Sequence, residues 1–168
     1  KEAVLEFFKE RLKNQLLSQD LPFDSIDAVL SAPWFDIVDA VKRVRALEGF
    51  KKDPACASLV VAFKRVSNIL KGAAIADKVD ESLFSLPEET SLYKTEKEIA
   101  PKIDGYWQRG DYEAVFSTLA SIKGDIDAFF DKVMVMAEDE GVRNNRLSLL
   151  NKLRGLYWRI ADLSRLAV

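Results

Sequence analysis

The stretch FFDKVMVMAEDEGVRNNRLSLL, residues 129–150, sorts its charges into blocks between two apolar runs. Three acids, Glu138 to Glu140, precede Gly141, and the basic and amide residues Arg143 to Arg146 follow it. The surface charges of an ordinary helical protein are mixed, so this separation is unusual. Arg and Asn side chains at the start of a helix can contact phosphates and base edges. The stretch therefore predicts a helix junction with a candidate nucleic-acid site.

Helical periodicity extends over nearly the whole chain, and no segment sustains the strict alternation of a half-buried strand. The sequence therefore predicts an all-α fold. Asp24 is expected to cap one helix, and Asp53 with Pro54 to begin another that stops at Gly72. We predict helices over about 1–19, 24–32, 35–50, 54–71, 88–108, 112–122, 125–140 and 142–166, with a loop and one helical turn between 73 and 89.

Apolar residues at helical spacing identify the expected core. The helices over 54–71 and 142–166 should be among the longest and should both line it, with Phe63 and Leu150 buried. Trp158, Met134 and Met136 are also expected to pack inside. The chain has 168 residues, which is about one domain.

Composition excludes several classes of chemistry. The chain contains no histidine and one cysteine, Cys56, so it lacks the commonest general base, the commonest metal ligand and any internal disulfide. A single thiol fits a reducing, cytoplasmic setting, and no apolar run approaches the roughly 20 residues that cross a membrane. The first residue, Lys1, already lies within a helical pattern, so we expect a domain taken from a longer chain.

Positive charge is concentrated in two blocks. The segment from Lys42 to Lys71 contains eight basic and two acidic residues, and the segment from Arg143 to Val168 contains six basic residues and one acid. In the first block, helical spacing places Lys64, Asn68 and Lys71 on one face, with Arg65 beside them. These side chains could contact RNA, or they could form the solvated face that any amphipathic helix needs.

The second block leaves two interpretations open. Residues 142–146 could bind phosphate at a helix N-terminus, or Arg143 and Arg146 could pair with the preceding acids while an asparagine caps the helix. The acids themselves are not expected to hold a metal ion, because adjacent carboxylates on a helix diverge by about 100°. We expect Glu138 to Glu140 to lie at a helix C-terminus in a structural ion-pair cluster.

Two segments resemble one family. Residues 129–150 are similar to an FFDxVMVMAEDExxRxNRLxLL-like signature of the bacterial glycyl-tRNA synthetase beta subunit, and AFKRVSNILK at 62–71 resembles its AFKRVxNIL-like element. The resemblance extends over most of the chain and is weakest from Ala73 to Lys102. It implies that residues 1–168 form an all-α, DALR-like anticodon-binding domain, a single helical bundle similar to that of arginyl-type class I synthetases.

The resemblance also implies a function and partners. The domain is expected to bind the anticodon arm of tRNA-Gly, alongside the rest of the beta subunit and the alpha subunit of a heterotetramer. The parent ligase uses ATP and magnesium, whereas this domain is expected to need no cofactor, metal site, catalytic residue or membrane. The residues expected to contact RNA are Lys64, Arg65, Asn68, Lys71, Arg143, Asn144, Asn145 and Arg146.

The alternative is a helical interaction domain whose basic blocks neutralise acids on a partner subunit or on this chain. The RNA hypothesis requires the two basic blocks to meet on one face. The interaction hypothesis requires an exposed apolar patch.

Overall fold

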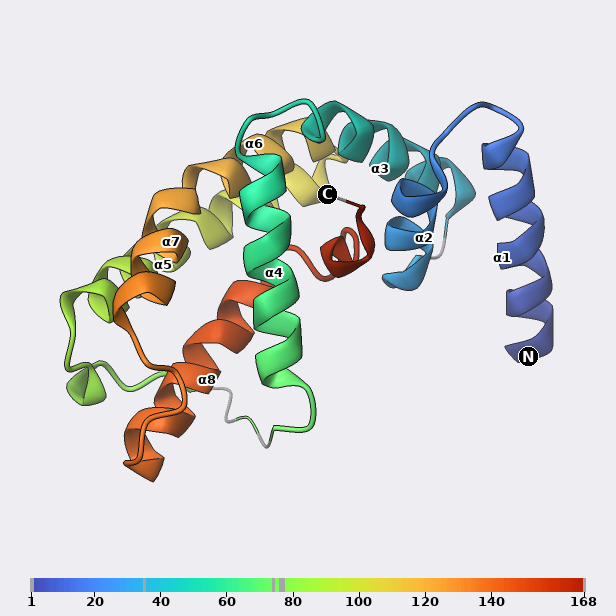
Figure 1. Ribbon diagram of the computed structural model, residues 1–168. Coiled ribbons are helices and arrows are strands. Elements are labelled where there is room, and N and C mark those ends of the chain that lie inside the picture. Colours follow the sequence, from blue (N-terminus) through green and yellow to red (C-terminus); the bar gives the residue numbers. More distant parts are fainter. Residues whose placement is uncertain (1, 35, 74, 76–77, 168) are drawn as a thin grey trace.

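The computed structural model describes residues 2–34, 36–73, 75 and 78–167, and these residues form helices and no β-strand (Figure 1). The all-α prediction is confirmed. The predicted helix starts at Lys1 and Phe35 lie outside the described residues. In chain order the elements are α1 (Glu2–Leu17), α2 (Phe23–Ser31), α3 (Ile37–Phe50), α4 (Cys56–Leu70), the 3-10 helix η1 (Glu81–Leu83), α5 (Pro87–Gln108), α6 (Tyr112–Ser121), α7 (Lys123–Lys132), α8 (Glu140–Gly155) and the 3-10 helix η2 (Leu163–Arg165).

Aspartates cap many of these helices. The side chains of the N-cap residues accept hydrogen bonds from backbone N–H groups that have no partner within the helix. The aspartates in this role are Asp36, Asp80, Asp111, Asp139 and Asp162.

Two of the predicted N-caps are misplaced. Pro22 occupies the N-cap position of α2, and Asp24 lies in the first turn, where its carboxylate pairs with Lys51 at 3.1 Å. Asp53 accepts a hydrogen bond from the Ala55 N–H at 2.7 Å, but α4 begins only at Cys56. The turn that includes Pro54 precedes the helix rather than opening it.

The predicted helix over 125–140 is wrong, because α7 ends at Lys132. Val133 and Val135 are buried, while Met134 and Met136 are 73% and 61% exposed. This alternation is that of an extended segment, and β-branched valines favour extended backbone over helix. The expectation that both methionines pack inside was therefore wrong.

The last predicted helix is too long, because α8 ends at Gly155. Tight turns follow, and they return Tyr157 and Ile160 to the core, so the apolar pattern continues where the helix does not. The predicted C-terminal position of the acids is also wrong. Asp139 caps the N-terminus of α8 and Glu140 is its first residue, where negative charge complements the helix dipole.

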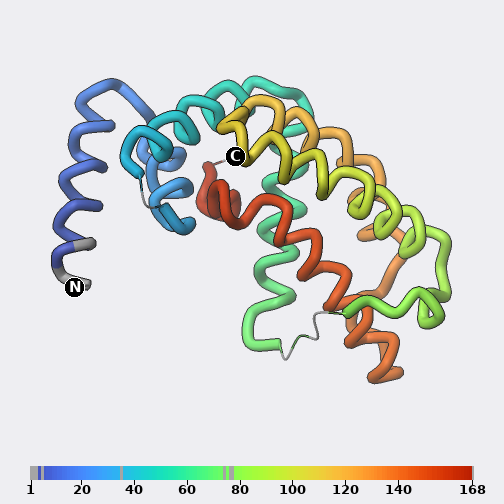
Figure 2. Tube along the Cα trace, turned by 180° about the vertical axis from the view of Figure 1, so that it is seen from behind, coloured from blue at the N-terminus to red at the C-terminus, as the bar shows by residue number. Residues whose placement is uncertain are grey.

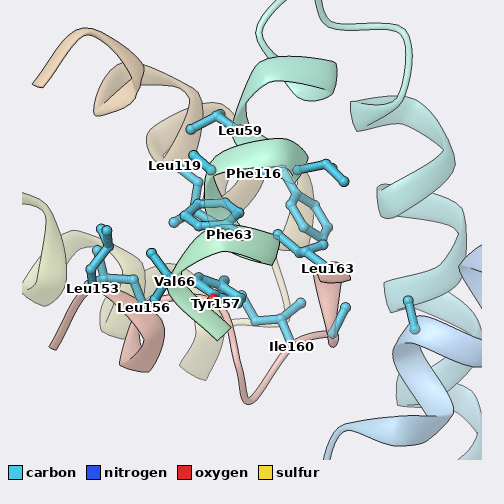
Figure 3. Packing of buried hydrophobic residues seen from close by; sticks show 14 of the residues in the cluster. Leu59, Phe63, Val66, Phe116, Leu119, Leu153, Leu156, Tyr157, Ile160 and Leu163 are labelled. Atoms are coloured by element: carbon cyan, nitrogen blue, oxygen red, sulfur yellow. The ribbon is translucent and has the colours of Figure 1, made fainter. Parts of the chain in front are cut away.

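The core centres on α4, which packs against α7, α8 and η2. The rings of Phe63 on α4 and Tyr157 beyond α8 lie 4.1 Å apart, centroid to centroid, among the leucines and Val66 that Figure 3 shows. Phe63 and Leu150 are both fully buried, which confirms the prediction that these two helices line the core. Close packing of such large side chains makes the relative position of α4 and α8 hard to change.

Helix α1 lies at one edge of the molecule in both views (Figures 1 and 2). It packs against α2 through Leu12 and Leu16, which are buried. Its other faces are exposed, and Val4, Phe7 and Phe8 on them are more than half exposed. The remaining helices form the body of the domain, in which α5 packs against α6, α7 and α8.

Candidate nucleic-acid interface

One flank of α4 carries the polar residues that the sequence grouped together. Asn68 and Lys71 are exposed, and Lys64 is half-buried with its Nζ donating to the Leu166 carbonyl at 2.8 Å. Their spacing places all three on the side of α4 that faces η2. Arg65 lies on the other flank, where its guanidinium stands 4.3 Å above the Phe130 ring of α7.

The end of α8 meets this flank at Tyr157. Burial raises the pKa of the Tyr157 hydroxyl to about 12, against smaller lowering effects from Ser67 of α4 and from the charge of Arg154. The hydroxyls of Tyr157 and Ser67 are both buried, and neither has a hydrogen-bond partner among the described residues. The Phe63 and Tyr157 rings lie 4.1 Å apart and α4 packs against α8, so the end of α8 lies against α4.

Arg154 is accompanied by an aromatic ring. Its guanidinium carbon lies 5.5 Å from the centroid of Trp158, which is 38% exposed. The expectation that Trp158 packs in the core was wrong, because Tyr157 and Ile160 take the inward positions of this turn. A guanidinium over an indole is a favourable cation–π arrangement and holds both groups at the surface.

Ion pairs divide the basic blocks into two sets. In the paired set, each base lies within 4.0 Å of a carboxylate. The pairs are Arg43 with Asp39, Lys51 with Asp24 and Glu48, Arg146 with Glu89, Arg159 with Asp104, and Arg165 with Asp27 and Asp162.

In the other set, no ion pair among the described residues joins the base to a carboxylate. Its members are Lys42, Arg45, Lys52, Lys64, Arg65, Lys71, Arg143, Lys152 and Arg154. Lys64 and Lys71 lie on one flank of α4, and Arg154 lies in the last turn of α8, which packs against α4. These three bases form no ion pair within the described residues, which leaves their charge available for contact with phosphate.

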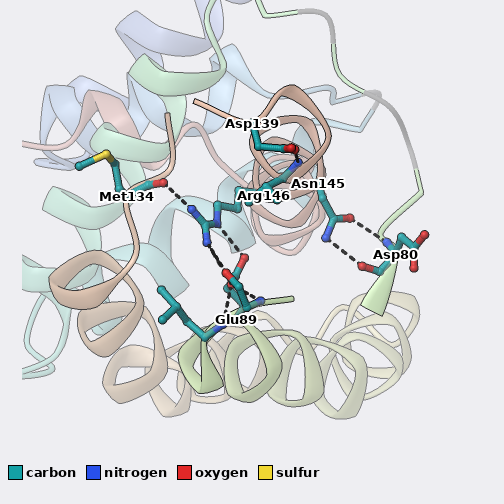
Figure 4. A network of polar contacts seen from close by, with 9 residues as sticks. Asp80, Glu89, Met134, Asp139, Asn145 and Arg146 are labelled. Carbon is teal, nitrogen blue, oxygen red and sulfur yellow. Dashed lines mark hydrogen bonds and ion pairs between the residues drawn. The ribbon is translucent and has the colours of Figure 1, made fainter. Parts of the chain in front are cut away.

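Arg146 belongs to a buried network instead (Figure 4). Its Nε donates to Glu89 Oε1 at 2.8 Å and its Nη1 to the Met134 carbonyl at 2.8 Å, while Nη2 contacts Ser85 and Glu89. Arg146 is 5% exposed and Glu89 is fully buried. Burial raises the pKa of the Glu89 carboxyl, but hydrogen bonds from Arg146 and from backbone N–H groups outweigh it, so the pKa lies below its usual value.

Asn145 has a similar role. Its side-chain amide accepts from the Asp80 N–H at 2.7 Å and donates to the Asp80 carbonyl at 2.9 Å, as a strand partner would (Figure 4). Asn145 is 5% exposed. These contacts attach α8 to α5 and to the segment before η1. We therefore assign Asn145 and Arg146 to the scaffold and base no RNA contact on them.

Arg143 and Asn144 lie at the other end of α8, beside the acids. Arg143 donates to the Ala137 and Glu138 carbonyls at 2.9 and 3.4 Å, and Asn144 is exposed. Within the described part of the chain, the carboxylates from Glu138 to Glu140 form no ion pair, so the predicted ion-pair cluster is wrong. Three exposed carboxylates next to Asn144 would repel a phosphate.

Two other kinds of feature, groups of metal ligands and membrane-spanning helices, can be judged over all the described residues. Among the residues that the structure describes, no three His, Cys, Asp or Glu side chains are grouped closely enough to hold an ion. None of the described helices combines the length and the apolarity that a membrane crossing requires.

Comparison with known proteins shows which family the chain resembles. Residues 59–156, from α4 to just past α8, match the model of the DALR anticodon binding domain. The glycine–tRNA ligase beta subunit of Syntrophus aciditrophicus (strain SB) is 44% identical over 163 residues, which are 97% of this chain and 24% of that protein. The same subunit of Geotalea uraniireducens (strain Rf4) is 42% identical over 163 residues, again 97% of this chain and 24% of the relative. The chain thus spans about a quarter of the length of these relatives.

Proposed function

Since this chain belongs to the DALR anticodon binding domain family, we propose that it binds the anticodon arm of tRNA-Gly as part of a glycine–tRNA ligase. The observation that supports this most directly is the surface around Tyr157. There Lys64 and Lys71 from the first basic block and Arg154 from the second stand on two helices that pack together, and none of the three forms an ion pair among the described residues. The proposal requires these three residues to face one bound RNA.

Each side chain on this surface has a separate task in the proposal. Lys71 and Arg154 would contact phosphates, which gives affinity for any RNA. Lys64 is partly occupied by the Leu166 carbonyl and would add charge rather than a direct bond. Asn68 lies one helical turn after Lys64 with its amide exposed, and an amide can contact the edge of a base. Asn68 is therefore the proposed source of sequence discrimination.

The proposal places the chemical step outside these 168 residues. The relatives are about four times as long as the chain, so most of the ligase lies elsewhere. We propose that the remainder of the beta subunit and an alpha subunit supply the ATP- and magnesium-dependent reaction in the cytoplasm. The domain described here would supply only the grip on the tRNA.

A filter-binding titration with tRNA-Gly and an anticodon-swapped tRNA tests the function. For the double variant Lys71→Ala with Arg154→Ala, the slope of log K against log salt should flatten by about 0.7 per lost contact with a single-stranded segment. Lys94→Ala with Lys102→Ala removes the same charge from exposed positions on α5 and serves as the matched control. If both double variants behave alike, the proposed surface is not the binding site.

Docking on another protein segment is a second candidate, favoured by α1. Val4, Phe7 and Phe8 leave an exposed apolar patch on this helix, with exposed fractions of 58%, 62% and 51%. This patch is separate from the basic surface, so the two functions are compatible. Phe7→Ser with Phe8→Ser should weaken association with the rest of the ligase in a pull-down while tRNA binding by the domain persists. Unchanged association would remove this candidate.

A further inference from the structure

Trp158 is exposed at the edge of the basic surface, and packing alone does not account for it. We propose that its indole is a stacking platform for one unpaired base of the bound RNA, with Arg154 holding the phosphate next to that base. This inference rests on the proposed tRNA-binding function and adds a residue that the sequence analysis had assigned to the core.

The other two tryptophans show what a structural tryptophan looks like in this fold. Trp107 is enclosed by Arg43 at 4.4 Å, Arg159 at 5.2 Å and the Tyr112 ring at 5.4 Å. Trp34 is half-buried and packs against the core. Trp34 and Trp107 are both half-buried, whereas Trp158 is 38% exposed.

The backbone fixes the side of the turn from which the Trp158 side chain projects. The Trp158 N–H donates to the Arg154 carbonyl at 3.0 Å in the turn that follows α8. Tyr157 and Ile160 on either side are fully buried, so the turn cannot rotate Trp158 inward without exposing them. Because the ring also packs against the Arg154 guanidinium, it has less conformational entropy to lose on binding than a fully exposed side chain, which favours a stacking role.

The charges around the ring favour a nucleic acid over an apolar protein segment. Arg154 lies over the indole without a carboxylate partner, and the charge of Lys71 stands on the neighbouring flank of α4. Stacking needs only the flat face of a base, so such a platform tolerates any sequence, while flanking cations hold the backbone. An apolar partner would leave these cations desolvated and unpaired, at a net cost.

Binding to an RNA hairpin with the anticodon arm of tRNA-Gly tests the proposal. Trp158→Ala should raise Kd by roughly 5- to 150-fold, the range that alanine substitution of a stacked aromatic produces. Trp158→Phe retains a flat ring and should keep most of the affinity. Neither change should alter the salt slope, because neither removes a charge.

Indole fluorescence supplies a signal that a purely structural role would not produce. Stacking on a base should quench the fluorescence of the original protein and of Trp34→Phe, and the quenching should be lost in Trp158→Phe. A hairpin with one abasic loop position should reproduce the loss of Trp158→Ala, and the two changes should not add, because they remove the same contact.

The outcomes separate the two proposals. If the original protein binds the hairpin with a salt-dependent Kd, but Trp158→Ala binds equally well and no quenching occurs, the stacking role is overturned and the tRNA-binding function stands. If the original protein does not bind, both are overturned. If Trp158→Ala fails to fold, Trp158→Phe decides the question, because quenching that persists in this variant contradicts the platform.

Discussion

Removing Arg146 should destabilise the domain without affecting its RNA surface. In Arg146→Met the fully buried Glu89 carboxylate loses its cation, and the Met134 carbonyl loses its donor. Removing one partner of a buried ion pair costs about 3–5 kcal/mol, much more than an exposed pair would. With an m-value of roughly 2 kcal/mol/M in urea, the midpoint of unfolding should fall by about 2 M.

Urea unfolding of three variants tests this reasoning. Arg146→Met with Glu89→Gln should be more stable than the sum of the single changes by about 1–3 kcal/mol, because the second change removes the uncompensated charge. The pKa of Glu89 is lowered in the folded protein, so the stability from the pair is present above the unfolded pKa and is lost as the pH falls through the folded pKa. The difference between the original protein and Arg146→Met should therefore shrink in acid. A loss below about 1 kcal/mol at neutral pH, or a selective loss of RNA affinity in folded Arg146→Lys, would refute the scaffold assignment.

Three further predictions concern single residues. Burial raises the pKa of Tyr157 to about 12, so the free energy of unfolding should be unchanged below pH 10 and should fall by about 2–3 kcal/mol as the pH rises from 10 through 12. Thermal unfolding at several pH values should show this decline, and it should be weaker in Tyr157→Phe. Asp139→Ala removes the 2.8 Å cap on the Val142 N–H and should cost about 1 kcal/mol in a urea titration, whereas Asp131→Ala, exposed at the end of α7, should cost almost nothing. Asn68→Ala should narrow the gap between tRNA-Gly and an anticodon-swapped tRNA by about 1–3 kcal/mol with the salt slope unchanged, and a lower melting temperature with intact selectivity would show a structural role instead.

Local patterns predicted much of this fold. The apolar stripe from Leu59 to Leu70 correctly predicted the buried face of α4. Gly72 correctly predicted where the helix stops, and it has the positive φ of 76° that such a stop requires. Asp111 caps α6 where the sequence expected a cap. These features depend on neighbours within one or two turns, so the sequence around them is sufficient.

The candidate site depended on contacts that no local pattern encodes. Arg146 and Asn145 look like surface residues in the sequence, yet their partners Glu89 and Asp80 are 57 and 65 residues away. Helical periodicity also continued past Gly155, because the turn that follows keeps Tyr157 inward, and this hid the outward position of Trp158. A buried ion pair between distant segments can be predicted only when the topology of the fold is known.

The acids that begin α8 and the bases in its last turn, Lys152 and Arg154, have a physical rationale, whereas Arg143 and Arg146 are placed by their contacts with the Ala137 carbonyl and with Glu89. Acids at its N-terminus and bases near its C-terminus both complement the helix dipole, so the helix itself favours this order. The same order gives the helix a negative end and a positive end at the surface. An RNA backbone would be repelled near Glu138 to Glu140 and attracted near Arg154, where the flank of α4 adds Lys64 and Lys71. In the proposed complex, an arrangement that stabilises α8 would therefore also orient a polyanion toward Trp158 and away from the acidic end.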